Sequence, residues 1–130
     1  MGIITDWLSS LRSKRSADSA SELQSKAEHG DAEARYYSKA VRRYQKAADQ
    51  GEVDAQYNLG YYYFAGLGVL QNYVLAHMWI SLAASSEDII LPDHQDRAIG
   101  KRDLVASKMT RYQIAEAQRL AREWKPKKER

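Results

Sequence analysis

Residues 52–85, EVDAQYNLGYYYFAGLGVLQNYVLAHMWISLAAS, decide the fold. In the first half, apolar residues recur with the spacing of one helical face: Ala55, Leu59, Tyr62 and Tyr63. Gly66 predicts the end of this helix, because the left-handed position after a helix suits a residue without a Cβ. Asn72 is a favourable N-cap residue and predicts the start of a second helix. The stretch therefore predicts two helices joined by a tight turn.

Small residues predict that these two helices pack closely. Gly60 lies inside the first helix, where glycine costs about 1 kcal/mol relative to alanine. We expect a packing reason, the close approach of the second helix. Ala76 and Ala83 leave room for that approach, and Trp79 fills the space between the helices. Neither helix can bury its apolar face alone, so the pair must stack on further helices.

The combined pattern, A-x-x-x-L-G-x-x-Y-x-x-G-x-G-V and then A-x-x-W-x-x-x-A-A, resembles the Sel-one-like repeat family, a relative of the tetratricopeptide repeats. The matching residues are Ala55, Leu59, Gly60, Tyr63, Gly66, Gly68, Val69, Ala76, Trp79, Ala83 and Ala84. The resemblance implies an all-α fold: a short α-solenoid of helix–turn–helix repeats with flanking capping helices. It also implies an adaptor or scaffold in protein complexes, with no enzymatic activity.

A second, truncated copy of the repeat lies upstream. Residues 39–48 align with residues 75–84 at an offset of 36, but residues 30–34 align with residues 51–55 at an offset of only 21. The upstream copy therefore lacks most of its first helix and the G-x-G turn. No glycine or proline interrupts what remains, which predicts one continuous helix over about residues 31–50.

We expect three parts in the chain. Residues 1–18 form an amphipathic N-terminal segment, residues 19–124 the helical repeat domain, and residues 125–130 a basic disordered tail. Within the domain, the truncated copy covers about residues 30–51 and the intact repeat about residues 52–86. Helical repeats need about three units for stability. Marginal stability, or a homo-oligomer that completes the stack, is therefore expected.

Capping signals place the flanking helices. A capping box at Ser19 predicts a short helix over about residues 20–29, and another at Thr110 starts the last helix. A helix over about residues 93–109 is predicted between the intact repeat and Thr110. Residues 102–126 resemble the C-terminal closing segment of bacterial Sel-one-like proteins.

The N-terminal segment carries an amphipathic stripe over residues 3–15. A capping helix or a loose end is the favoured interpretation, and a helix that contacts a membrane surface is the alternative. The segment is no secretory signal, because it lacks a cationic start and Asp6 interrupts its apolar run. The chain has no cysteine and therefore no disulfide. The cytoplasm is the expected location.

By residue count, the net charge of +3 lies in the predicted tail, residues 125–130. Residues 125–130 hold four basic residues and one acidic residue, and the remainder holds 16 of each. A neutral body does not predict a nucleic-acid-binding face.

The sequence predicts no catalytic, cofactor-binding or metal-binding residue. His77 is expected to be partly exposed beside Ala76. His94 lies between Asp93 and Asp96, groups that can bind metals, but no second cluster with ligand spacing accompanies them. The sequence offers no phosphate-binding loop, because its G-x-G ends a helix instead of opening one.

The candidate partner-binding residues are Tyr57, Tyr61 and Phe64, which share one helical face. By resemblance to tetratricopeptide units, these side chains line a concave groove for a partner protein. The alternative is that the preceding long helix covers them as ordinary core. Two other functions stay open: a truncated structural or regulatory fragment that has lost the groove, and a small enzyme or metal-binding protein.

Overall fold

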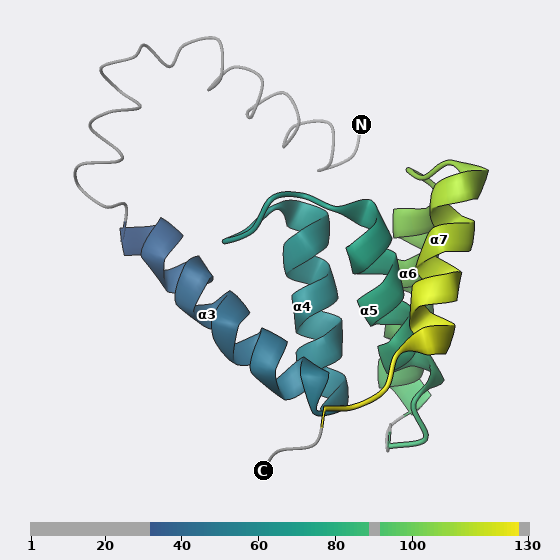
Figure 1. Cartoon of the computed structure of the whole chain (residues 1–130), viewed down its shortest axis with the longest axis horizontal. Coiled ribbons are helices and arrows are strands. Elements are labelled where there is room, and N and C mark those ends of the chain that lie inside the picture. The colour runs from purple at the N-terminus through teal and green to yellow at the C-terminus, as the bar shows by residue number, and fades with distance from the viewer. Residues whose placement is uncertain (1–31, 89–91, 128–130) are drawn as a thin grey trace, which may run out of the picture. The chain divides into compact units, whose positions relative to one another are not determined.

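The structure, a computed structural model, describes residues 32–88 and 92–127. The described residues form helices and no strand, which confirms the all-α fold class (Figure 1). The helices are α3 (Ala32–Asp49), α4 (Val53–Ala65), α5 (Tyr73–Ser85), α6 (Pro92–Ala106) and α7 (Arg111–Glu123). The predicted N-terminal segment and the predicted helix over residues 20–29 lie outside the described residues. The chain divides into residues 1–35 and residues 36–130, and the packing below lies within the second unit.

Helices α4 and α5 form the predicted hairpin. Gly66 ends α4 in the left-handed conformation at φ 70°, and the Asn72 side chain accepts a 3.0 Å hydrogen bond from the Leu75 N–H at the start of α5. A Cβ added to Gly60 would lie 2.5 Å from Cγ1 of Ile80 on α5. The two helices therefore approach where only a glycine fits.

The truncated copy forms one uninterrupted helix, α3, as predicted. Its inner side packs against α4 through edge-to-face aromatic contacts. The centroid of the Tyr62 ring lies 5.8 Å from that of Tyr37 and 5.5 Å from that of Tyr44. The turn after α4 abuts the α3 backbone, since a Cβ on Gly68 would lie 2.6 Å from the Tyr37 carbonyl. Gly68 has φ 70°, so both conformation and space require glycine there.

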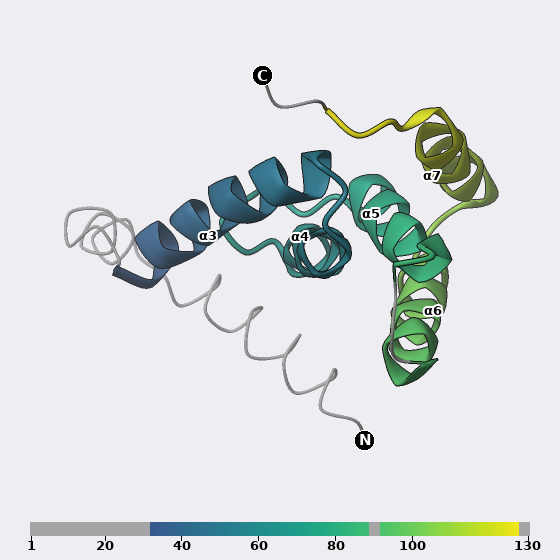
Figure 2. The ribbon, with the colours of Figure 1, turned by 90° about the horizontal axis from the view of Figure 1, so that it is seen from below.

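Helix α5 is the central helix and packs against α4, α6 and α7 (Figures 1 and 2). Two apolar clusters share it. The first comprises Val41, Ala48, Ala55, Leu59, Met78 and Trp79, with Leu120, Ala121 and Trp124 of α7 packed against it. The second comprises Ala76, Ile80, Ala84, Ala98 and Val105 and joins α5 to α6. The fold thus depends on an apolar α5.

Helix α6 shares one short feature with α4. Ile99–Gly100 follows Leu59–Gly60 by 40 residues. The surroundings of the two glycines differ, however, because a Cβ on Gly100 would meet no atom within 4 Å.

Helix α7 begins at the predicted capping box of Thr110 and Gln113 and packs against α5.

The C-terminal segment returns to the junction of α3 and α4. The Lys127 N–H donates a 2.7 Å hydrogen bond to the Asp49 carbonyl, and the Lys127 ammonium lies 3.3 Å from the Asp49 carboxylate. A Cβ on Gly51 would lie 3.8 Å from Trp124. Lys127 belongs to the segment that the sequence predicts to be a basic disordered tail, and in the structure it contacts Asp49. Residues 128–130 lie outside the described residues.

Candidate interaction groove

Helix α4 presents the aromatic stripe toward α6. Tyr57 and Phe64 are partly buried against the cluster that joins α5 to α6, while Tyr61 keeps 40% of its surface exposed. The Phe64 ring also packs on Tyr73, with centroids 5.8 Å apart. Helix α3 contacts the neighbouring Tyr62. The described packing therefore places the stripe on the side of α4 away from α3.

Two cations of α6 face this stripe. The Lys101 ammonium lies 6.0 Å from the centre of the Tyr61 ring, within cation–π range. Burial raises the pKa of the Tyr57 hydroxyl, and the positive charge of Arg97 acts against that rise. Within residues 32–88 and 92–127, neither Arg97 nor Lys101 forms an ion pair with a carboxylate.

A hollow of about 790 Å³ opens at one end of the stripe, between the start of α4, the end of α5 and the start of α6. It is lined by Gln50, Gly51, Glu52, Val53, Asp54, Tyr57, Asn58, Ala83, Asp88, His94, Arg97 and Ala98. We call the stripe, the two facing cations and this hollow the α4–α6 groove. The hollow end of this groove carries carboxylates and its middle carries cations. The groove can therefore bind a peptide segment through aromatic contacts and ion pairs.

The two cations lie at the same sequence distance from the two tyrosines. Arg97 follows Tyr57 by 40 residues, and Lys101 follows Tyr61 by the same interval. The sequence interpretation missed both cations. The pair Ile99–Gly100, which is similar to Leu59–Gly60, is the nearest sequence signal to them.

The residues that carry the repeat pattern lie mostly in the core. Buried positions are Ala55, Leu59, Gly60, Ala76, Trp79, Ala83 and Ala84. Tyr63 and Val69 are partly buried against the clusters. Gly66 and Gly68 both have φ 70° and shape the turn.

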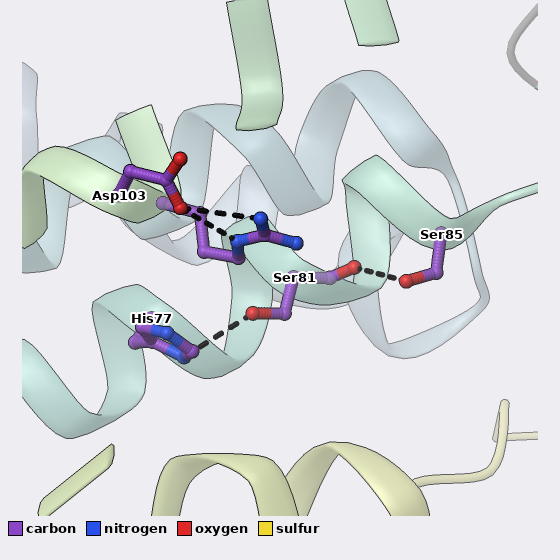
Figure 3. Close-up of polar contacts among 5 residues, drawn as sticks. His77, Ser81, Ser85 and Asp103 are labelled. Carbon is purple, nitrogen blue, oxygen red and sulfur yellow. Dashed lines mark hydrogen bonds and ion pairs between the residues drawn. The ribbon is translucent and has the colours of Figure 1, made fainter. Parts of the chain in front are cut away.

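His77 is buried, and the expectation of a partly exposed side chain was wrong. It keeps only 4% of its surface exposed, because it lies on a side of α5 that faces residues of α6, among them Arg102 and Asp103. A 3.2 Å hydrogen bond joins His77 Nδ1 to the Ser81 hydroxyl (Figure 3). Burial lowers the pKa of His77, nearby Arg102 lowers it further, and Asp103 opposes both. The pair lies within one helix and outside the lining of the hollow, so its contacts serve packing.

The Asp93–Asp96 segment does not assemble a metal site. Among the described residues, no group of three histidine, aspartate or glutamate side chains is close enough to hold a metal ion. His94 instead lines the hollow. In the same part of the chain, no helix combines the length and apolar character needed to cross a bilayer.

Comparison with known proteins identifies the repeat. A family model described as Sel1 repeat matches residues 29–52 and residues 53–88. The first match coincides with the truncated copy, and the second covers the α4–α5 hairpin. No curated protein and no solved structure matches the chain.

Proposed function

Residues 29–52 and 53–88 are Sel1 repeats, and from that premise we propose that the chain is a non-enzymatic adaptor or scaffold that binds a partner protein in the α4–α6 groove. Sel1 repeats generally mediate protein–protein interaction. The observation that carries the proposal is the stripe of Tyr57, Tyr61 and Phe64, in which Tyr61 is exposed and which two cations of α6 face across the groove.

Tyr61 is the side chain we expect to contribute most to binding. Aromatic residues dominate the energetic centres of interfaces, where burial of a large ring costs little side-chain entropy. Tyr61 still has 40% of its surface to bury, and its ring already has a cation beside it. Tyr57 and Phe64 are more deeply buried and hold the floor of the groove.

The test replaces Tyr61 with a photo-crosslinking phenylalanine analogue and does the same at Tyr112. Tyr112 is the matched control, because it lies on α7 with 87% of its surface exposed. We expect a discrete crosslinked partner from position 61 and none from position 112. Equal crosslinking at the two positions, or none at 61, contradicts the groove as the binding surface.

A companion variant separates binding from folding. Tyr61→Ala should change the free energy of unfolding by no more than about 0.5 kcal/mol, as exposed substitutions do, and should abolish partner capture. Tyr112→Ala should change neither. A large loss of stability in Tyr61→Ala would assign Tyr61 to the core.

One observation favours a second candidate, a structural or regulatory fragment that has lost its groove. The truncated copy supplies a single helix where the intact repeat supplies two. This candidate predicts a chain that captures no partner and melts without a cooperative transition. Circular dichroism during heating, together with the crosslinking experiment, distinguishes the two.

A further inference from the structure

One face of α6 is exposed, whereas the corresponding face of α4 is buried. On α4, Gln56 and Gly60 are buried. The residues 40 positions later, Asp96 and Gly100, are exposed, and a Cβ on Gly100 would meet no atom within 4 Å. Asp103 is exposed two turns after Asp96 and pairs with the adjacent Arg102. The uncovered face of α6 is therefore acidic, with a glycine at its centre.

The outer face of α3 has the opposite charge. Lys39, Arg42, Arg43 and Lys46 are all exposed, and their spacing puts them in one stripe. The stripe lies opposite the side that buries Val41. Between residues 36 and 48 there is no acidic residue. Charge is therefore separated within the helical body, although residues 125–130 still hold the net positive excess of the chain.

The stripe accounts for the positive charge of the second unit. Apart from its four cations, residues 36–127 hold nine basic and ten acidic residues. The rest of the unit is therefore nearly neutral, and α3 is the part that an acidic surface would attract.

We propose that the basic face of α3 docks on the acidic face of α6 of a second copy, so that copies join head to tail. The two faces match in length. Lys39 and Lys46 are seven residues apart, as are Asp96 and Asp103, which is about 10 Å along a helix. Gly100 lies between the two carboxylates and leaves room for the second helix, as Gly60 does for α5.

The geometry requires a second copy. Helices α4 and α5 lie between α3 and α6 in both views, so the two faces of one chain do not meet (Figures 1 and 2). The contact joins two different surfaces, and such a contact builds open chains of copies unless the rotation closes a ring. Exposed ion pairs are individually weak and are screened by salt, so the association is weak and sensitive to ionic strength.

Sedimentation of the full chain tests the proposal. In about 20 mM salt, where screening is weak, the weight-average mass should rise with concentration above the 14.8 kDa of one chain. In about 500 mM salt, where charges more than a few ångströms apart are screened, it should return to one chain. A chain that stays monomeric at every concentration in low salt overturns the proposal.

Neutralised variants identify the faces. Arg42→Gln with Arg43→Gln, and separately Asp96→Asn with Asp103→Asn, should each yield a monomer in low salt. An equimolar mixture of the two variants should form a 1:1 dimer and nothing larger, because each keeps one intact face. The control, Arg111→Gln with Arg122→Gln, removes two exposed cations from α7 and should associate like the parent.

The mixture and the parent chain also test whether the basic face of α3 binds something other than a second copy. If the mixture stays monomeric while both variants keep the parent's circular dichroism, the two faces do not bind each other. If the parent stays monomeric in low salt yet binds anionic lipid vesicles or RNA through α3, the basic face serves a polyanion and the proposal fails. Tyr61→Ala should associate like the parent, which separates this contact from the proposed groove.

Discussion

Gly60 and Gly100 both lie inside helices and have opposite surroundings. At Gly60 an added Cβ would lie 2.5 Å from Cγ1 of Ile80 and 3.0 Å from the Ala76 carbonyl, whereas at Gly100 it would meet open space. The sequence pattern predicted the packing reason for Gly60 but could not distinguish the two sites, because the pattern does not show which face α5 covers.

These two positions predict opposite effects of the same substitution. Gly60→Ala should destabilise the fold by about 1–3 kcal/mol, because the added methyl overpacks the contact with α5. Gly100→Ala should stabilise it by up to about 1 kcal/mol, because alanine is the better helix former and nothing obstructs it. Urea denaturation of both variants measures the difference. Shifts of the same sign would contradict the close approach at Gly60.

Trp79 should be the most costly side chain to remove. It keeps 4% of its surface exposed and meets Trp124 of α7 edge-on, with ring centres 6.1 Å apart. Trp79→Ala should cost about 3–5 kcal/mol, as deletion of a large aromatic core residue does, and should abolish cooperative melting. Calorimetry checks this, and a variant that melts like the parent would place Trp79 outside the core.

His77 should make the fold sensitive to acid. Its pKa is lowered in the folded chain, so the unfolded chain binds the proton more tightly. Its contribution to stability is therefore full above the unfolded pKa of about 6.5 and falls as the pH drops below that value. His77→Gln should show a smaller loss of stability between pH 7.5 and pH 5.5 than the parent, whatever its absolute stability. A loss of stability equal to the parent's over this interval would contradict the contribution of buried His77.

At the scale of helices, boundaries depend on local chemistry, and the sequence predicted most of them. Gly66 and Asn72 bound the turn of the hairpin, and α3 is continuous because nothing in it breaks a helix. The return of the C-terminal segment to Asp49 could not be predicted, because the contact joins residues 78 positions apart and depends on how α7 packs.

The capping box of α7 predicts a measurable cost. The Thr110 hydroxyl accepts a 3.1 Å hydrogen bond from the Gln113 N–H, and the Gln113 side chain accepts one of 2.8 Å from the Thr110 N–H. Thr110→Ala should destabilise the chain by about 1 kcal/mol, as N-cap substitutions do. Chemical denaturation measures it. Ser85→Ala, which removes a hydroxyl near the end of α5, should cost less, and equal costs would contradict the capping role.

At the scale of the whole molecule, stability converges on α5. It contributes to both clusters and is the only described helix that packs against three others extensively. The repeat pattern predicted the pairing of α4 with α5 but not the central position of α5, because the partners of its remaining faces come from weakly patterned segments. The charged residues of α3 and α6 can be found in the sequence. That they lie on opposite outer faces could not be predicted, because it depends on how the helices pack.

Hydrogen exchange should reveal this centre. Amides of α5 should exchange only when the whole unit unfolds, because opening α5 would expose both clusters. Amides of α6, which has one described partner cluster, should exchange earlier through local opening. Measurement by NMR at neutral pH decides this, and uniform protection of α5 and α6 would contradict a single central helix.

The return of Lys127 to Asp49 has a practical consequence for labelling. Asp49 precedes Gln50 and Gly51, which line the hollow, so a dye attached at position 127 sits beside the mouth of the groove. Its fluorescence would report occupancy directly, with no need to know the ligand in advance. By the same reasoning, a bulky purification tag fused there would obstruct the entrance, and assays with such a tag would underestimate affinity.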